Sequence, residues 1–210
     1  MDLTGGNVAR FDAWAPVYEA SALQDVYYAR VHDRVLAMAS AAGASPAPRR
    51  VLDVGCGTGR LLRTAADAFP EARLVGVDIS AGMLAQAVAM TGAAERDAYV
   101  RADSAALPFA DGAFDVVTCT ANSHHWPEPT AALGELHRIT ASRGLLVLAH
   151  LEGVASWDPP GRRHIRRRGV RISARLAVPL LDCGFRITDA ALFADCPLMP
   201  ATVVLGARRR

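Results

Sequence analysis

Three glycines at alternate positions follow a short aliphatic run in VLDVGCGTGR, Val51 to Arg60. Glycine adopts backbone conformations that other residues avoid and lets a ligand approach the main chain closely. Two phosphate-binding patterns use such a loop. The ATP-binding pattern needs a lysine after its last glycine, and this chain contains no lysine. The dinucleotide pattern G-x-G-x-x-G needs glycine at its sixth position, where this chain has Arg60.

Carboxylates accompany the glycine loop. Asp53 lies two residues before the first of its glycines, on the expected strand, and a negative side chain there suits a cationic ligand better than a phosphate. Asp78 follows about twenty residues later, at the end of VGVD, where an acidic group can accept hydrogen bonds from ribose hydroxyls. Asp103 lies in RADSAALPF. A helix cap at Asp78 and a turn at Asp103 are the structural alternatives.

These segments resemble the class I S-adenosylmethionine-dependent methyltransferases, whose first motif is [VIL]-L-D-[VIL]-G-C-G-T-G. VGVDIS and RADSAALPFADGAFDVV resemble the following motifs in the same order, so the resemblance spans Val51 to Val117. FDAWAPVYE, Phe11 to Glu19, is similar to the amino-terminal segment of the small-molecule, quinone-biosynthesis-like branch (methyltransferase types 11 and 25). The amphipathic pattern of this segment also fits a helix that only packs.

The resemblance implies S-adenosylmethionine as the cofactor, with a sulfonium and an ammonium group and no phosphate. It implies that Asp78 binds the ribose and Asp103 the adenine amine, that Tyr18 contacts the methionine end, and that Cys56 fills space. No metal site is expected. The expected cofactor-binding residues are Tyr18, Asp53, Gly55, Cys56, Gly57, Gly59, Asp78, Ile79, Met83, Asp103, Ser104, Ala105, Thr120 and Asn122.

The segment TANSHHWPEP would lie at the acceptor pocket in this family. Methyl transfer is an in-line displacement that depends mainly on orientation and exclusion of water. His124 and His125 are the candidate catalytic bases, and packing or cofactor shielding is the alternative role. A [DNS]-P-P-[YFW] run, typical of enzymes that methylate amino nitrogens of nucleobases or glutamine, does not occur here. We therefore expect a small-molecule acceptor, with its O, N or C atom left open.

Short apolar runs alternate with helical patterns, which predicts an α/β protein with a doubly wound, mostly parallel sheet. The resemblance adds seven strands in the order 3-2-1-4-5-7-6 with the last strand antiparallel, a Rossmann-like fold whose ligand lies at the carboxyl ends of the strands. The expected strands are 50–54, 73–78, 99–101, 114–119, 144–150, 185–193 and 202–207, and the expected helices are 60–69, 81–90, 129–140 and 173–183.

The length of 210 residues favours one compact unit. We expect an amino-terminal helical cap over 1–48 and a cofactor-binding core over 49–210, with a lid insertion at about 151–175. Seven arginines lie between Gly161 and Arg175. A solvated face is the simplest role for them, and a functional role would be to attract an anionic acceptor, an acyl-carrier partner or RNA.

Composition excludes several classes of protein. The net charge is +2, so nucleic acid is an unlikely partner, and no apolar run is long enough to span a membrane. Four scattered cysteines and a start without signal-peptide character predict a cytoplasmic protein. The oligomeric state is not determined. The alternatives are a nicotinamide-dependent oxidoreductase, disfavoured by Arg60, Asp53 and the lack of a Tyr-x-x-x-Lys pair, and a non-catalytic S-adenosylmethionine-binding protein.

Overall fold

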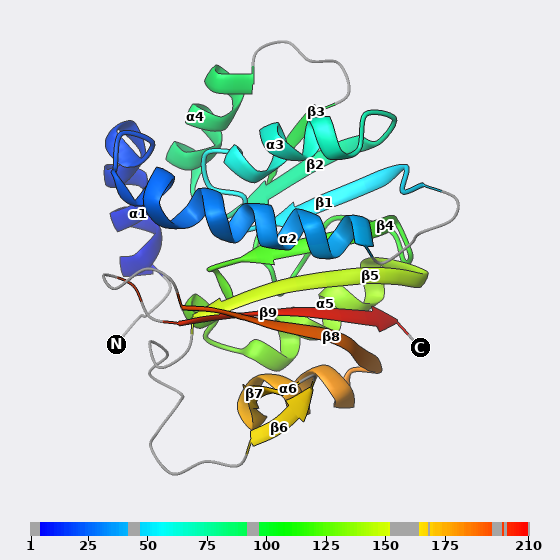
Figure 1. Cartoon of the computed structure of the whole chain (residues 1–210). Coiled ribbons are helices and arrows are strands. Elements are labelled where there is room, and N and C mark those ends of the chain that lie inside the picture. The colour runs from blue at the N-terminus through cyan, green and yellow to red at the C-terminus, as the bar shows by residue number, and fades with distance from the viewer. Residues whose placement is uncertain are drawn as a thin grey trace.

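The computed structural model of the chain describes residues 5–41, 47–91, 97–151, 164–167, 169–194, 199 and 201–209. Its centre is a seven-stranded sheet in the order β3-β2-β1-β4-β5-β9-β8 (Figure 1). β9 runs antiparallel to both of its neighbours, β5 and β8, and the remaining strand pairs are parallel. The predicted fold class and strand order are therefore confirmed. The strands are β1 (Arg50–Val54), β2 (Arg73–Asp78), β3 (Asp97–Arg101), β4 (Phe114–Thr120), β5 (Thr140–Leu151), β8 (Phe185–Phe193) and β9 (Thr202–Arg209).

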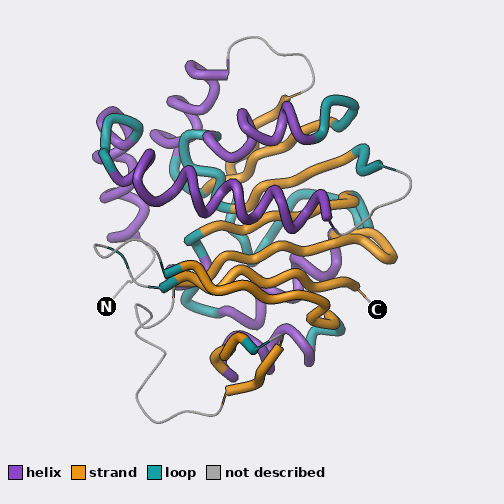
Figure 2. Tube along the Cα trace, viewed as in Figure 1, coloured by secondary structure: helices purple, strands orange, loops and turns teal. Residues whose placement is uncertain are grey.

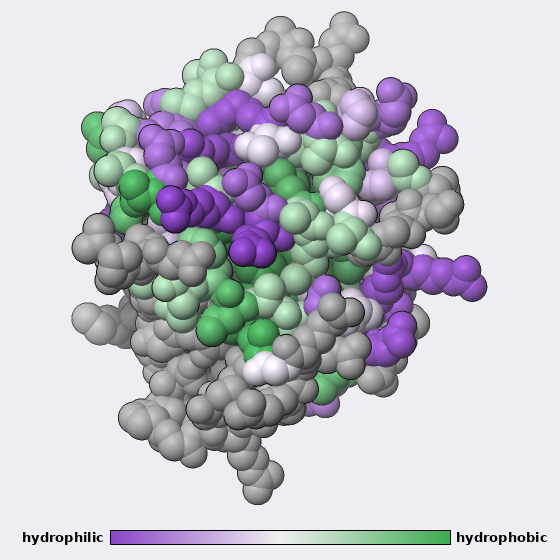
Figure 3. Space-filling view, viewed as in Figure 1, coloured by the Kyte–Doolittle hydropathy of each residue, from purple (hydrophilic) through white to green (hydrophobic). Residues whose placement is uncertain are grey.

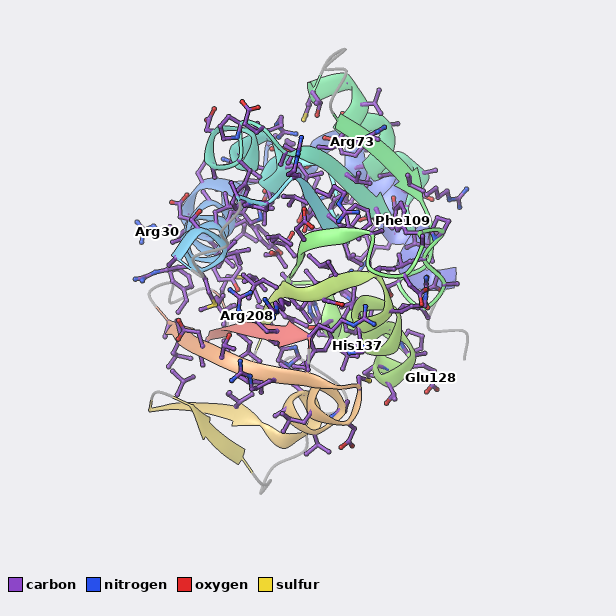
Figure 4. The ribbon with its side chains drawn as sticks, turned by 90° about the vertical axis from the view of Figure 1, so that its right-hand side faces the viewer. Arg30, Arg73, Phe109, Glu128, His137 and Arg208 are labelled. Carbon is purple, nitrogen blue, oxygen red and sulfur yellow. The ribbon has the colours of Figure 1, made fainter. Side chains whose placement is uncertain are left out.

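Helices cover both faces of the sheet (Figure 2). On one face α2 (Ala29–Ala41), α3 (Arg60–Ala68) and α4 (Ala81–Thr91) share a buried cluster with the strands, and on the other face α5 (Pro129–Ile139) and α6 (Ala174–Asp182) share a second. Figure 4 shows Arg30 of α2 and His137 of α5 on opposite sides of the sheet. No helix in the described part of the chain is long and apolar enough to cross a membrane.

The outer sides of α2 and α3 are polar. Figure 3 shows hydrophilic side chains gathered over this part of the molecule, above a less polar region closer to the sheet. Val31, Val35 and Ala39 of α2 are fully or almost fully buried, and their spacing of four residues places them on one side of the helix. This stripe packs α2 onto the sheet, so α2 contributes to the same hydrophobic cluster as β1.

Local signals in the sequence explain where several helices begin and end. α3 follows Gly59, whose φ of 76° is left-handed, and its end is followed by Pro70. The Ser80 hydroxyl accepts a 3.1 Å hydrogen bond from Met83 N, which caps the start of α4 as predicted. Pro129 occupies the first turn of α5, and Gly184, with φ 96°, follows α6.

The amino-terminal segment forms α1 (Gly5–Tyr18) and a π-helical turn, η1 (Gln24–Tyr28), ahead of α2. α1 packs against α4, at the end of the sheet where the parallel strands terminate (Figure 1). Asp12 joins the two helices, because its Oδ1 accepts hydrogen bonds from Ser80 Oγ at 2.6 Å and Gly82 N at 2.8 Å. α1 is thus fixed to the start of α4, whereas α2 lies on the face of the sheet.

Part of the expected lid segment has a regular structure that the sequence did not predict. β6 (His164–Arg167) and β7 (Val170–Ser173) form a two-stranded antiparallel sheet that packs against α6 and β8. Ile165 pairs with Ile172 in this hairpin, and the surrounding arginines obscure the alternating pattern. The hairpin lies beside β8, at the opposite edge of the main sheet from β3. Residues 152–163 and 168, and all seven arginine side chains of the basic run, lie outside the described part.

Candidate active site

A pocket of about 570 Å³ opens where β1, β2, β3 and β4 end, beneath α1. This is the point where the strand order reverses between β1 and β4, the usual ligand position in a doubly wound sheet. Most of the predicted site residues line it. They are Tyr18, Gly55, Gly57, Asp78, Ile79, Met83, Asp103, Ser104, Asn122, His124 and His125.

The glycine loop between β1 and α3 requires its glycines. Gly55, Gly57 and Gly59 have φ values of 74°, 53° and 76°, a region that side chains with a Cβ rarely adopt. A Cβ on Gly55 would overlap the side chain of Asn122. A Cβ on Gly59 would lie 2.5 Å from the hydroxyl of Tyr99. The loop therefore packs tightly on its neighbours, and Gly55 and Gly57 present backbone to the pocket.

Asp78, at the carboxyl end of β2, holds the glycine loop and also lines the pocket. Its Oδ2 accepts a 2.9 Å hydrogen bond from Gly57 N, and its Oδ1 accepts one of the same length from Ser80 N. Burial raises the pKa of Asp78, although these hydrogen bonds act in the opposite direction. The Ile79 backbone N–H also donates to this carboxylate. A carboxylate offers about four acceptor sites, so the side chain can still accept a hydrogen bond from a ligand.

Asp103 and Ser104 line the pocket from the turn after β3. The Asp103 Oδ1 accepts a 2.9 Å hydrogen bond from Ala105 N, which closes a local turn. Asp103 thus has the turn role considered above and lines the pocket as well.

Five of the predicted cofactor-binding residues do not line the pocket: Asp53, Cys56, Gly59, Ala105 and Thr120. The Asp53 side chain is 2 % exposed and accepts a 2.8 Å hydrogen bond from Thr118 Oγ1. Burial raises the pKa of Asp53 to about 7, so near neutral pH its carboxyl group is only partly ionised. Asp53 therefore lies outside the pocket lining, and its effect on a cationic ligand stays a prediction.

Cys56 is buried behind the loop. Its Sγ lies next to Gly76 of β2, where an added Cβ would be 2.8 Å away. Burial raises the pKa of the Cys56 thiol. This placement agrees with the predicted space-filling role and gives no reactive thiolate.

Aromatic side chains of α1 form one wall of the pocket. Phe11, Trp14 and Tyr18 all line it. A Cβ added to Gly57 would lie 4.0 Å from the Tyr18 ring, so Tyr18 faces the glycine loop. Tyr28 of η1 stands behind Tyr18, with ring centroids 6.3 Å apart. Burial is the main cause of the raised pKa values of both tyrosines, which keeps their hydroxyls protonated at neutral pH.

The loop after β4 forms the facing wall. Ala121 has a φ of 50°, an uncommon value for a residue with a Cβ, and its N–H donates to Ala149 O at 2.9 Å. The Asn122 side chain lies against Gly55. A short 3-10 helix, η2 (Ser123–His125), follows and carries both histidines. Strained backbone of this kind often occurs at functional sites.

Both histidines are held neutral. Burial, together with the charges of His125, His150 and Arg10, lowers the pKa of His124 to about 3. Burial and Arg10 also lower the pKa of His125. The two rings are in contact, with centroids 3.9 Å apart, and Phe11 packs edge-on against His125 at 5.3 Å. With so low a pKa, His124 is a weak general base, so its placement favours packing and shielding over proton transfer.

Sequence reasoning did not assign some lining residues to the site, among them Arg10, Phe11, Trp14, Trp126 and Pro127. Phe11 and Trp14 belong to the amphipathic pattern of α1, and Trp126 and Pro127 follow the histidines directly. Those signals place these four side chains near the site without giving them a role. No pattern in the sequence predicts that Arg10 lines the pocket, because its position depends on how α1 packs against the rest of the protein.

Residues 52–148 match the protein family described as "Methyltransferase domain". The chain is 36% identical over 141 residues to malonyl-[acyl-carrier protein] O-methyltransferase of Geobacter sulfurreducens, which covers 67% of this chain and 48% of that protein. It is 43% identical over 117 residues to demethylmenaquinone methyltransferase of Thermus thermophilus, covering 54% of this chain and 50% of the relative. The chain thus spans about half the length of these curated relatives.

A solved structure covers the whole chain. Magnesium protoporphyrin IX methyltransferase from Synechocystis PCC 6803, with bound SAM, has a TM-score of 0.76 and 24% identity, and the match covers 100% of this chain and 98% of that chain. Residues 52–148 are therefore similar to a methyltransferase domain, and the whole chain has the fold of an S-adenosylmethionine-dependent methyltransferase.

Proposed function

We propose that this chain binds S-adenosylmethionine and transfers its methyl group to a small-molecule acceptor by in-line displacement. The observation that carries the proposal is a convergence on one pocket. The glycine loop after β1, Asp78 after β2 and Asp103 after β3 meet there, facing the aromatic wall of α1. Because the chain spans about half the length of its curated relatives, the proposal concerns the chemistry that this pocket supports.

The pocket fits such a cofactor. Its volume of about 570 Å³ falls within the ~300–1,000 Å³ typical of small-molecule sites. Gly55 and Gly57 leave the backbone bare where a Cβ would narrow the pocket. Asp78 and Asp103 supply hydrogen-bond acceptors and negative charge, and no arginine lines the pocket near the glycine loop within the described residues. This combination suits a cationic nucleoside better than a diphosphate.

We assign the cofactor contacts to the predicted residues that line the pocket. Asp78 accepts hydrogen bonds from the ribose hydroxyls, and Asp103 with Ser104 holds the adenine. Tyr18, Gly55 and Gly57 adjoin the methionine part. Ile79, Met83 and Asn122 complete the contact surface.

When bound, S-adenosylmethionine supplies an electrophilic methyl group on its sulfonium. The chain contributes orientation and a dry environment, through Phe11, Trp14 and the neutral His124 and His125 rings that enclose the other end of the pocket. Such effects raise the rate of a displacement without a strong base. The acceptor's O, N or C atom stays open.

We further infer the roles of the larger segments. α1 acts as the cap over the site, within the expected cap 1–48, and the remainder from 49 is the cofactor-binding core. The described part of the expected lid at 151–175 contributes no residue to the pocket lining. Cys56, Cys119 and Cys183 are free thiols, which supports a reducing compartment such as the cytoplasm. Cys196 lies outside the described residues.

Isothermal titration calorimetry with S-adenosylmethionine, S-adenosylhomocysteine and NAD tests the cofactor. We expect binding of the first two and none of NAD, and binding of NAD alone would contradict the proposal. Replacing Asp78 by Ala should weaken S-adenosylhomocysteine binding by about 1 to 3 kcal/mol, because the ribose hydroxyls would lose their partner. Asp53→Asn is the matched control, because Asp53 precedes the same loop without lining the pocket.

Turnover is tested separately, with a radiolabelled methyl donor and a panel of small acceptors. Transfer of label to a panel member supports an enzyme. Tight cofactor binding without transfer to any acceptor in a broad panel would favour a non-catalytic binding protein instead.

A further inference from the structure

The two ends of the pocket differ in charge. Asp78 and Asp103 lie where β2 and β3 end, and they are the carboxylates among the described residues that line it. Arg10 of α1 is the single arginine in that lining. Burial lowers the pKa of both His124 and His125, so among the described residues of this lining Arg10 alone supplies a permanent positive charge.

Arg10 lies at the end of the pocket away from the glycine loop. Tyr18 faces Gly57, and Arg10 precedes Tyr18 by eight residues of the same α-helix, a distance of ~12 Å along its axis. Its immediate neighbour Phe11 contacts His125, and the charge of Arg10 acts on both histidines. Arg10 is therefore close to the loop after β4, and far from the methionine end that the proposed function places at Tyr18.

The Arg10 guanidinium has no carboxylate partner in the described part of the chain. Its recorded contact is with the ring of Phe11, whose centroid lies 5.2 Å from the guanidinium carbon. Arg60 and Arg63, near the other end of α1, differ in this respect. Arg63 pairs with Glu19 at 2.7 Å, and Arg60 pairs with Glu19 at 3.5 Å. An exposed, uncompensated guanidinium beside a pocket attracts a carboxylate, which it can bind through two hydrogen bonds.

Aromatic rings continue from Arg10 into the pocket. Trp14 and Phe11 are stacked with centroids 6.3 Å apart, Phe11 meets His125 at 5.3 Å, and His125 meets His124 at 3.9 Å. A continuous wall of ring faces and edges favours a planar ligand, because offset and edge-to-face contacts gain energy beyond burial alone. The positive charge of Arg10 therefore lies beside this wall of aromatic rings.

We propose that the methyl acceptor is an aromatic carboxylate, with its carboxylate paired to Arg10 and its ring packed against Phe11, Trp14 and His125. This assignment rests on the proposed methyltransferase function and names the acceptor class for the same pocket. Arg10 is then a specificity-determining residue. One arginine matches the single charge of a carboxylate, whereas a phosphate group would call for more cationic donors than the described residues of this wall provide.

The test compares three probes on protein saturated with S-adenosylhomocysteine: 4-hydroxybenzoate, 4-hydroxybenzamide and cyclohexanecarboxylate. The amide lacks the charge and the cyclohexane lacks the planar ring. We expect 4-hydroxybenzoate to bind most tightly. Arg10→Gln should weaken its binding about 10- to 100-fold, the loss expected for a hydrogen-bonded charge, and should leave the binding of the amide unchanged. Arg30→Gln removes an exposed arginine of α2 that does not line the pocket, and should change neither.

Each other outcome has a clear meaning. If Arg10→Gln weakens S-adenosylhomocysteine binding, Arg10 serves the cofactor and the inference is wrong. Equal binding of the benzoate and the benzamide, or no binding of any probe to a protein that does bind S-adenosylhomocysteine, also overturns it and leaves the proposed function standing. A wild-type protein that binds neither S-adenosylmethionine nor S-adenosylhomocysteine would instead contradict the proposed function.

Discussion

Asp12 on α1 caps the start of α4 from a position 68 residues earlier in the chain, with its Oδ1 2.6 Å from Ser80 Oγ. The same oxygen accepts a hydrogen bond from Gly82 N at 2.8 Å. These bonds lower the pKa of Asp12. They also hold α1 where Phe11, Trp14 and Tyr18 line the pocket, so the docking of one helix creates one wall of the site.

Replacing Asp12 by Ala should therefore affect the site more than the rest of the fold. We expect a melting temperature a few degrees lower and weaker S-adenosylhomocysteine binding, because α1 loses its attachment to α4. Thermal denaturation and calorimetry measure the two effects. Asp33→Ala, on an exposed position of α2, is the control and should alter neither. Unchanged cofactor binding in Asp12→Ala would contradict the role of α1 as a wall.

Gly82 permits the close approach of α1 and α4. A Cβ at this position would lie 3.0 Å from both Cα and the carbonyl oxygen of Asp12, which are backbone atoms that cannot rotate away. Gly82→Ala should push α1 outward and weaken cofactor binding. Gly134 in α5 is the matched control, because a Cβ there meets nothing within 4 Å. Gly134→Ala should stabilise the protein by about 0.5 to 1 kcal/mol, as alanine does inside helices. If denaturant titrations gave the same change in the free energy of unfolding for Gly82→Ala and Gly134→Ala, the close packing of α1 on Gly82 would not matter and the prediction would be wrong.

Asp53 should contribute to the pH dependence of stability with an unusual sign. Its pKa is raised to about 7, chiefly by burial, so between about pH 4 and 7 the folded state binds more protons than the unfolded state. The free energy of unfolding linked to Asp53 therefore falls as the pH rises through that range. An asparagine at position 53 cannot ionise, so Asp53→Asn does not lose stability as the pH rises. We expect this variant to be more stable than the wild type at pH 8, by roughly 1 to 3 kcal/mol, and to differ little from it at pH 4.

Asp115 provides a comparison with the opposite sign. Burial alone would raise its pKa, but hydrogen bonds from Arg50 and the Arg49 backbone outweigh burial and lower it. Asp115→Asn should therefore be less stable than wild type at neutral pH, and the difference should shrink as the pH falls through the pKa of the folded protein. Denaturant titrations at several pH values measure both variants. If the free energy of unfolding of Asp53→Asn depended on pH as steeply as that of the wild type, the raised pKa assigned to Asp53 would be contradicted.

His124 should not control activity near neutral pH. Since its pKa is lowered to about 3 in the folded protein, we expect kcat/KM to show no titration of His124 between pH 5 and 8. Replacing His124 by Gln should lower the rate without removing a pH-dependent limb. A wild-type rate that falls below pH 6.5, in a manner abolished by His124→Gln, would instead identify this residue as a general base.

Stability gives a second measure of the same histidine. In the unfolded chain His124 takes up a proton below about pH 6.5, whereas the folded protein resists protonation down to about pH 3. Stability linked to His124 is therefore lost as the pH falls from about 6.5. Between pH 7 and pH 4, the free energy of unfolding should therefore fall by about 1 to 2 kcal/mol less in His124→Gln than in the wild type.

Much of the core could be predicted from local patterns. The bounds of β1, β2 and β8 agree with those expected, and other elements differ by one to four residues at their ends. The β6–β7 hairpin was missed because a charged run hides its alternation. The bounds depend on residues that act locally, such as the Ser80 cap, and on aliphatic runs that the helices bury on both faces.

The sequence by itself determined the glycine loop, the strand order implied by the motif series, and the carboxylates that follow β2 and β3. The loop and the carboxylates follow from backbone preferences and short spacings within one segment, whereas the strand order is what the family resemblance of the motif series implies. Only the tertiary structure decided that Asp53 does not line the pocket, that burial lowers the pKa values of His124 and His125, and that Arg10 lines the same pocket as they do. The physical reason is that burial and charge depend on neighbours brought together from distant segments, here α1, the glycine loop and the loop after β4.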